Sequence, residues 1–168
     1  MRLYLIRHAI AIERESVDLF SDAARELTPD GIDKMRHNAR VLRKLGVSID
    51  EVWTSPLVRA RQTAEILAEN LTPIPPVHVV KALEPNGHFE TILQALEARE
   101  SNLDAVALVG HEPYLGAFTS FLIGGPRNLS IAFKKGGAAL VKIDEFQPPL
   151  RGELCWLMTP KQMNHIDG

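Results

Sequence analysis

The sequence predicts an α/β fold, a three-layer α/β/α sandwich whose central sheet is mostly parallel and has an antiparallel edge near the C-terminus. Strand-like and helix-like segments alternate along the chain, which is typical of a parallel sheet connected by helices. The strand-like segments 3–6 and 105–110 are apolar throughout, as strands are when helices cover both faces of a sheet. Two later segments, 138–143 and 154–158, predict a final antiparallel pair.

The predicted elements follow one another in order after the first strand. Residues 9–26 are polar and have no strong period. Thr28 then predicts a helix N-cap, and Pro29 suits the first helical position, where its missing N–H group costs no hydrogen bond. A stripe of apolar residues at helical spacing continues this helix, and Gly46 predicts its end. The stripe consists of Ile32, Met35, Ala39, Leu42 and Leu45.

The middle of the chain continues the alternation. The remaining strands are predicted at 52–55, 77–80 and 105–110, and the remaining helices at about 56–71, 89–99 and 113–124. No internal repeat, low-complexity tract or linker interrupts the series. A chain of 168 residues with 45% hydrophobic residues suits one domain with its own core. We therefore expect a single domain over residues 1–168.

Composition and charge exclude several classes of protein. The 19 basic and 21 acidic residues give a net charge of −2, which offers no general attraction to nucleic acid or to an anionic membrane. No apolar stretch approaches the roughly 20 residues that a membrane span needs, and the N-terminus lacks the regions of a signal peptide. Cys155, the only cysteine, excludes an intrachain disulfide and is interpreted as a buried strand residue. We expect a soluble cytoplasmic protein.

Cationic and imidazole side chains follow the predicted buried strands. Arg7 and His8 close the first strand, and His111 follows the strand at 105–110. Arg59 lies in the first turn of the helix that opens after the second predicted strand. Because ligands of open α/β sheets bind beyond the carboxyl ends of the strands, these residues are expected to gather at one site. Two histidines and two arginines there suit the binding of a phosphoryl group.

Four motifs in this order resemble the histidine phosphatase (phosphoglycerate mutase-like) superfamily. They are Arg7-His8, Leu-Thr-Pro-Asp-Gly at 27–31, Ser-Pro-Leu-Val-Arg-Ala-Arg-Gln-Thr-Ala at 55–64, and Val-Gly-His-Glu-Pro at 109–113. The short chain and the Gly-His-Glu-Pro form of the last motif are most similar to the SixA-type phosphohistidine phosphatases. The resemblance spans nearly the whole chain and implies a phosphoglycerate mutase-like fold. One departure is Ala9, where the family signature has glycine; alanine fits there unless the position requires a positive φ.

The resemblance implies that His8 is the nucleophile and forms a covalent phosphohistidine. An imidazole attacks phosphorus only when it is neutral and held in one tautomer, so one ring nitrogen is expected to donate to a fixed acceptor such as a backbone carbonyl. Arg7 and Arg59 are the expected phosphate-binding residues, since guanidinium groups offer paired donors to phosphoryl oxygens. His111 is expected to be protonated and to donate to the same group. Arg61 is interpreted as a solvated helix residue.

The identity of the general acid is left open between two interpretations. Many members of the family carry a carboxylate in the segment after the third strand, where this chain has Glu84; the same residue also fits a surface loop. His88 is on the same segment and is expected to face solvent. No zinc site is expected at His111, because Leu115 stands where a His-Glu-x-x-His motif needs its second histidine. We expect no metal and no cofactor.

Other polar residues have no motif around them. His37 is interpreted as a helix-face residue, His78 as part of a strand or sheet edge, and His165 as part of a mobile tail. The Lys-Lys-Gly-Gly turn at 134–137 is interpreted as a solvated loop, with contact to an acidic partner as the alternative.

These assignments predict a metal-independent phosphatase that hydrolyses phosphohistidine, or another phosphorylated group, on a protein. The sequence has no P-loop, acidic magnesium-binding cluster or Cys-x5-Arg motif for other phosphatase chemistries. Only residues 71–89 separate the helices on either side of the third strand, which leaves no room for a helical lid and predicts an open, shallow pocket. Such a pocket suits a phosphorylated protein as the partner better than a buried metabolite.

The alternatives come from different classes of protein. A small-molecule phosphomonoesterase or a mutase would share the catalytic residues, but a mutase needs a closed site that excludes water. A non-catalytic phosphate-binding module would keep the pocket without turnover, which the complete set of two histidines and two arginines disfavours. A receiver-like signalling domain is excluded, because Arg7 and His8 replace the acidic cluster expected at the end of its first strand.

Overall fold

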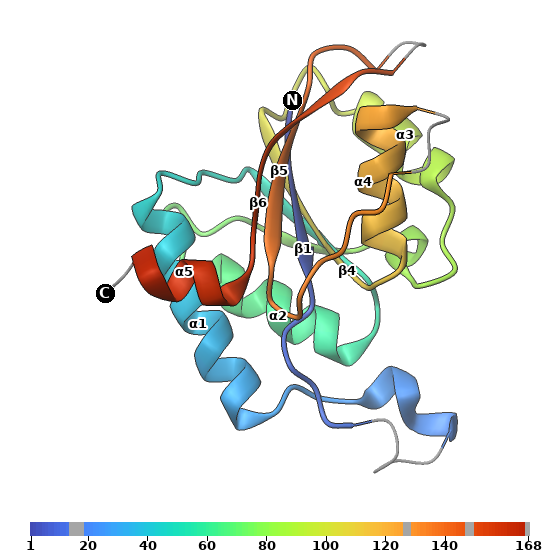
Figure 1. The fold of residues 1–168 in the computed structure, drawn as a ribbon. Helices are drawn as coiled ribbons and strands as arrows, with labels where there is room; N and C mark the ends of the chain where they lie inside the picture. The colour runs from blue at the N-terminus through green and yellow to red at the C-terminus, as the bar shows by residue number, and fades with distance from the viewer. Residues whose placement is uncertain (14–18, 126–128, 147–149, 167–168) are drawn as a thin grey trace.

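A computed structural model describes residues 1–13, 19–125, 129–146 and 150–166 (Figure 1). These residues form one six-stranded mixed sheet in the order β3-β2-β4-β1-β5-β6. β1 is parallel to β4, β4 to β2 and β2 to β3, whereas β5 is antiparallel to both β1 and β6. The predicted mostly parallel sheet with an antiparallel C-terminal edge is confirmed. The strands are β1 (Arg2–Arg7), β2 (Glu51–Thr54), β3 (Val77–Val79), β4 (Ala105–Gly110), β5 (Ala138–Ile143) and β6 (Gly152–Met158).

Helices cover both faces of the sheet, which confirms the three-layer sandwich (Figure 1). α1, α2 and α5 pack on one face, where Met35, Leu67 and Met163 are buried in one cluster. α3 and α4 pack on the other face, where Ile92 and Phe118 belong to a second cluster. The helices are α1 (Pro29–Lys44), α2 (Val58–Glu69), α3 (Phe89–Glu97), α4 (Tyr114–Gly124) and α5 (Pro160–Ile166), with short 3-10 helices η2 (Leu19–Ala24) and η3 (Lys81–Leu83).

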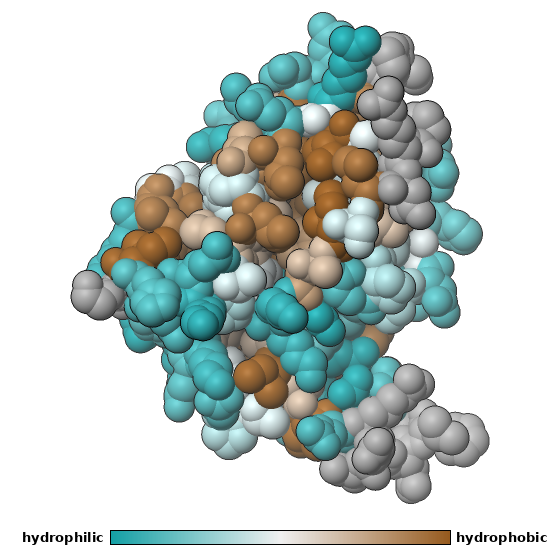
Figure 2. Space-filling view, in the orientation of Figure 1, coloured by the Kyte–Doolittle hydropathy of each residue, from teal (hydrophilic) through white to brown (hydrophobic). Residues whose placement is uncertain are grey.

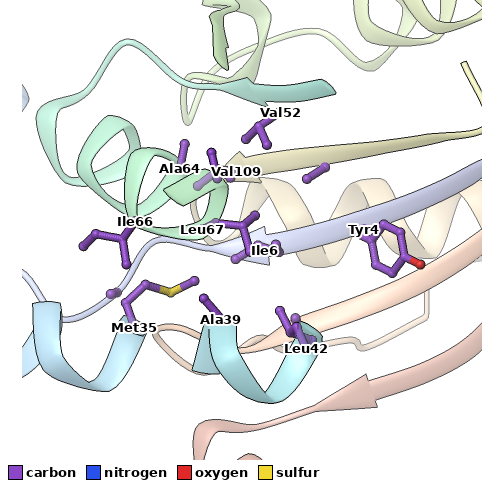
Figure 3. Packing of buried hydrophobic residues seen from close by; sticks show 14 of the residues in the cluster. Tyr4, Ile6, Met35, Ala39, Leu42, Val52, Ala64, Ile66, Leu67 and Val109 are labelled. Atoms are coloured by element: carbon purple, nitrogen blue, oxygen red, sulfur yellow. The ribbon is translucent and has the colours of Figure 1, made fainter. Parts of the chain in front are cut away.

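The core between the sheet and the first two α-helices holds the central strands in place (Figure 3). Ile6 of β1 and Val109 of β4 belong to one cluster with Met35 of α1 and Leu67 of α2, and each is at most 1% exposed. Burying an aliphatic side chain of this size contributes roughly 1.5–3 kcal/mol. The packing thus fixes the carboxyl ends of β1 and β4 side by side.

The register between β1 and β4 decides where the two motif histidines lie. Arg7 pairs with Gly110, so His8 and His111 follow neighbouring strands at the same level. The backbone N–H of His8 also donates to the carbonyl of Gly110 at 3.0 Å. A slip of one residue would turn every side chain of the strand to the opposite face. The register therefore brings two residues that are far apart in the sequence to one site.

The segment after His8 is held against the start of α1. Thr28 caps the helix, as predicted, because its side chain accepts a hydrogen bond from the N–H of Gly31 at 3.0 Å. The N–H of Thr28 donates to the carbonyl of Ile10 at 2.9 Å. Gly31 permits this contact, since a Cβ at its position would lie 2.1 Å from the oxygen of Ile10. The chain leaving His8 is thus fixed by backbone contacts.

Three details differ from the prediction. Leu45 is 48% exposed rather than part of the core stripe, because α1 has already ended. Residues 160–166 form α5 rather than a mobile tail, since Met163 is fully buried and anchors the helix on α1; His165 is exposed on it. Cys155 is exposed rather than buried, because β6 is the edge strand and alternates half-buried with exposed residues along most of its length.

The connection between α2 and α3 contains only β3 and η3, so no α-helix lies between residues 70 and 88. His37 lies on α1 and His78 on the edge strand β3, as predicted. None of the helices in the described part of the chain is long and apolar enough to cross a membrane. On the face shown in Figure 2, hydrophobic residues gather over β6 and α4, and hydrophilic residues cover most of α1.

Candidate active site

A cavity of about 510 Å³ lies beyond the carboxyl ends of β1 and β4. The four residues predicted to bind the phosphoryl group, Arg7, His8, Arg59 and His111, all line it. The other charged residues of its wall are Asp22, Arg25, Glu112 and Lys135. Cationic side chains outnumber carboxylates among these described residues, so the cavity favours an anion.

His8 is held in one orientation and one tautomer. Its Nδ1 lies 2.7 Å from the carbonyl oxygen of Ala9. A carbonyl oxygen only accepts hydrogen bonds, so Nδ1 carries the proton and Nε2 keeps its lone pair. The N–H of Ala9 in turn donates to Oγ1 of Thr63 at 3.0 Å, which ties this turn to α2. No described residue other than glycine has a positive φ, so alanine fits position 9 without strain.

The surroundings of His8 keep its imidazole neutral. The residue is 7% exposed, and burial is the largest of the causes that lower its pKa to about 4. The hydrogen bond to Ala9 raises the pKa, whereas the positive charges of Arg59, Arg7 and Lys135 lower it. At pH 7 His8 is therefore an unprotonated imidazole, the form that a nucleophile requires.

His111 lies beside His8 in the cavity wall. The two ring centroids are 5.1 Å apart, and Nε2 of His111 lies 2.8 Å from Oγ of Ser55. Burial, and after it His8 and Arg59, lower the pKa of His111 to about 3, so the ring is neutral at pH 7 in the absence of a bound anion. The predicted protonated state is that of the ring with a phosphoryl group bound, and it stays a prediction. A phosphoryl dianion beside the ring would act in the opposite direction and favour the imidazolium.

Ser55 is a residue of the site whose role the sequence interpretation misses. It is fully buried directly after β2, and its N–H donates to the carbonyl of Val109 at 3.0 Å. This backbone bond places the serine hydroxyl against the ring of His111. Ser55 is the first residue of the motif at 55–64, and a buried hydroxyl group ordinarily has a hydrogen-bond partner. Its partner could not be inferred, because the order of the strands in the sheet decides which strand lies beside it.

Arg7 is anchored through the backbone of the segment before β5. Its Nη1 donates to the carbonyl oxygen of Phe133 at 2.6 Å. Glu112 holds this segment, because its carboxylate accepts hydrogen bonds from the N–H groups of Phe133 and Gly116. Gly116 allows the close approach, since a Cβ there would lie 2.2 Å from the oxygen of Ile131. Burial lowers the pKa of Arg7 and the charge of Glu112 raises it; the guanidinium stays protonated.

Arg59 is the second residue of α2 and is 4% exposed. Its Nη1 donates to the backbone carbonyl of Asp22 at 2.7 Å, and its Nη2 lies 3.3 Å from the Asp22 carboxylate. Arg61, on the same helix, is exposed, as predicted. The sequence interpretation misses Asp22, because η2 lies in the polar stretch that has no period. The cavity wall therefore includes a segment whose position only the folded chain reveals.

Glu84 does not line the cavity that holds the two histidines. It lines a neighbouring hollow of about 370 Å³, together with Asn86 and His88. Asn86 and Pro85 also line the main cavity, so this segment borders the site with other side chains. His88 is exposed, as predicted. The role of Glu84 as a general acid stays a prediction.

Comparison with known proteins agrees with this geometry. A sequence model described as "Histidine phosphatase superfamily (branch 1)" matches residues 3–91, more than half of the chain. The chain belongs to this superfamily. An uncharacterized protein of Picosynechococcus sp. is 38% identical over 165 residues, which cover 96% of this chain and 98% of that protein. The phosphohistidine phosphatase SixA of Escherichia coli is 29% identical over 161 residues, which cover 95% of this chain and 94% of SixA.

The fold agrees with the same family. A solved structure of the protein histidine phosphatase SixA complexed with tungstate matches with a TM-score of 0.84 at 29% identity. The match covers 97% of this chain and 99% of that chain. The SixA-type resemblance and the phosphoglycerate mutase-like fold are therefore confirmed, and the chain is a phosphatase of the histidine phosphatase superfamily.

The buried histidines give the stability of this phosphatase a defined dependence on pH. The pKa values of His8 and His111, about 4 and about 3, lie below the ordinary value of 6.5. As the pH falls below 6.5, the unfolded chain binds protons at these residues that the folded chain does not. The free energy of unfolding is therefore expected to fall between pH 6.5 and 4, with about 3 kcal/mol due to His8. Well above pH 6.5 the two residues have no such effect.

Urea unfolding at pH 7 and at pH 4, in a phosphate-free buffer, measures this contribution. Wild type is compared with His8→Gln, and the exposed His165→Gln serves as the matched control. Between the two pH values, His8→Gln is expected to lose about 3 kcal/mol less stability than wild type and the control. Equal losses in all three proteins would contradict the neutral, buried state of His8.

Proposed function

We propose that this phosphatase hydrolyses phosphohistidine on a protein, through a covalent phosphohistidine formed at His8. The observation that carries the proposal is the state of this side chain. It is a neutral imidazole whose Nδ1 is fixed by Ala9, in a cavity wall that also holds the guanidinium groups of Arg7 and Arg59. The similarity to SixA, a phosphohistidine phosphatase, supports the same substrate class. A phosphorylated protein is therefore the proposed partner.

The first step transfers the phosphoryl group to the enzyme. Nε2 of His8 attacks phosphorus, while the bond from phosphorus to the substrate's imidazole nitrogen breaks and its electron pair stays on that nitrogen. The departing imidazole is readily protonated by solvent, so the step does not depend on a carboxylic acid such as Glu84. Arg7, Arg59 and His111 bind the phosphoryl oxygens and stabilise the charge of the transition state.

The second step returns the enzyme to its starting state. Water attacks the phosphorus of the phosphohistidine and loses a proton to solvent, while the bond to Nε2 breaks and inorganic phosphate leaves. Nδ1 keeps its proton in both steps, because it donates a hydrogen bond to the carbonyl of Ala9. Cationic side chains balance the negative charge of the phosphoryl oxygens in both steps, and we propose that the reaction is independent of metal. Among the described residues, no group of three or more His, Cys, Asp and Glu could hold a metal ion.

Access to the cavity supports a large substrate. The segment between α2 and α3 forms only β3 and η3, so it supplies no helical lid over His8. A site without such a lid admits a side chain that projects from the surface of another protein. It also admits the water that the second step needs, which favours hydrolysis over the closed reaction of a mutase.

Phosphate release from three substrates tests the proposal: a phosphohistidine-bearing protein, p-nitrophenyl phosphate and a sugar phosphate, each in the presence of EDTA. The phosphoprotein is expected to have the highest kcat/KM, by roughly tenfold or more, which corresponds to about 1.4 kcal/mol. Efficient turnover of the sugar phosphate would instead favour a small-molecule phosphomonoesterase. Loss of activity in EDTA would contradict the metal-independent reaction. Tungstate binding without any phosphate release would favour a non-catalytic module.

A further inference from the structure

A second cavity adjoins the active site on the side of α1 and α5. It has a volume of about 540 Å³ and shares two wall residues, Arg7 and Lys135, with the cavity that holds His8. Its other walls come from the segment after His8, α1, the turn before β5 and the start of α5. In Figure 1 these elements meet between α1, α5 and the lower end of β5. Nothing in the mechanism above uses this cavity.

The rim of the second cavity is positively charged. Lys34, Lys134 and Lys161 line it in addition to the two shared cations, and none of the described lining residues is an aspartate or a glutamate. Lys34 is paired with Asp30 at 2.7 Å. No described carboxylate pairs with Lys134 or Lys161, both of which are exposed. The rim therefore presents positive charge that the protein itself does not neutralise.

The floor of this cavity is largely apolar and contains one unsatisfied polar atom. Ile10, Met35 and Pro160 contribute hydrocarbon to it. Asn38 also lines the cavity, is 1% exposed, and donates from Nδ2 to the carbonyl of Gly136 at 3.1 Å. Its Oδ1 has no hydrogen-bond partner among the described residues. Buried polar atoms are ordinarily satisfied by protein or by ordered water, so this oxygen is an acceptor for a donor that enters the cavity, such as water or a peptide N–H group.

We infer that the second cavity binds an acidic segment of the phosphoprotein substrate, one that carries an apolar side chain between carboxylates. Carboxylates match the lysine rim, the apolar side chain matches the floor, and a peptide N–H matches Oδ1 of Asn38. A free inorganic anion would use only the first of these features. The inference deepens the proposed function and rests on it for the substrate class. It also favours the acidic-partner alternative for the turn at 134–137.

The turn at 134–137 couples the two cavities. The N–H of Gly136 donates to the carbonyls of Arg7 and His8, each at 3.1 Å, and the N–H of Arg7 donates to the carbonyl of Gly137 at 3.1 Å. The lysines of the turn are therefore held at a fixed place relative to the nucleophile. One polypeptide can follow the shared wall, with its phosphohistidine at His8 and its acidic segment beside Lys134.

Charge reversal at the rim tests the inference. The double variant Lys134→Glu/Lys161→Glu is compared with Lys44→Glu/Lys142→Glu, which makes the same charge change at exposed lysines elsewhere. KM for a phosphohistidine protein with an acidic flanking segment is expected to rise roughly tenfold or more in the rim variant relative to KM for p-nitrophenyl phosphate, a change of about 1.4 kcal/mol. The control variant is expected to change neither KM. Equal effects of the two variants, or equal effects on both substrates, would overturn the inference.

A binding experiment separates this inference from the proposed function. A fluorescent peptide with a leucine between glutamates is titrated with wild type and with each double variant, at low and at high salt. Wild type and the control are expected to bind it about equally, and the rim variant roughly tenfold more weakly or worse. A peptide with lysines in place of the glutamates is expected not to bind. Peptide binding that follows this pattern supports the cavity assignment even if phosphohistidine hydrolysis fails, and absence of binding to wild type overturns it.

Discussion

Replacement of His8 by alanine is expected to lower the rate of phosphate release by roughly 10⁴-fold or more, since removing an essential nucleophile costs about this much in enzymes whose residues act as a unit. In the proposed mechanism this side chain supplies the atom that forms the bond to phosphorus. Its Nδ1 is already fixed by Ala9 and its ring is neutral, so no other conformational or protonation step prepares it. Initial rates with the phosphohistidine protein and with p-nitrophenyl phosphate measure the loss.

Two further measurements show whether His8→Ala removes chemistry or merely the fold. Tungstate binding, followed by calorimetry, is expected to persist in the variant, because Arg7 and Arg59 remain in the cavity wall. Substrate labelled with ³²P, quenched in alkali, is expected to leave an acid-labile label on wild type and none on the variant. His165→Ala, an exposed histidine on α5, is expected to behave as wild type. Appreciable turnover by a folded His8→Ala protein would refute the mechanism.

Replacement of Arg59 by alanine is expected to lower kcat/KM by roughly 10²–10³-fold, the usual cost of losing one preorganised donor to a transition state. Arg59 is buried in the cavity wall, where water does not screen its charge well. Arg59→Lys is expected to recover only part of the loss, because an ammonium group cannot offer the paired donors of a guanidinium. Steady-state kinetics of both variants with the same two substrates measure the effect.

Arg61→Ala is the matched control for Arg59, since it removes the same side chain from an exposed position on the same helix. It is expected to leave kcat/KM within about twofold of wild type, because an exposed, solvated charge contributes little. Asp22→Ala removes the contact of Arg59 with the Asp22 carboxylate and leaves the hydrogen bond to the Asp22 backbone carbonyl in place. If Asp22→Ala loses as much activity as Arg59→Ala, then the pairing of Arg59 with this carboxylate, rather than its action on the phosphoryl group, explains the loss.

Apolar patterning predicts much of this fold because burial decides where strands and helices form. The segment 105–110 is a strand with the predicted bounds, and all of its residues are buried. Thr28 and Pro29 mark the start of α1 through local hydrogen bonding, which requires no knowledge of distant segments. α5 was not predicted, because a short helix with one buried residue, Met163, gives no period.

The sequence predicts those residues of the candidate site that lie at the ends of strands or at the start of a helix. His8, Arg59 and His111 follow or open strands and helices, and that is a local property of the sequence. The roles of Ser55 and Asp22 could not be predicted, because sheet order places one beside a histidine and the return of η2 places the other beside an arginine. The protonation states of His8 and His111 likewise could not be predicted from local sequence, since they depend on how deeply each ring is buried in the folded chain.

Arg7 binds a main-chain oxygen, and Glu112 likewise holds the main-chain N–H of Phe133 rather than a side chain. These atoms are present whatever residues stand nearby. The identities of the exposed side chains at Ser130 and Ala132 therefore do not affect the hydrogen bond of Arg7, whereas Ile131 and Phe133 also pack in the core. Gly116 has no such freedom, because any side chain there collides with the carbonyl of Ile131. The exposed part of this segment can thus vary in sequence without moving the guanidinium of Arg7.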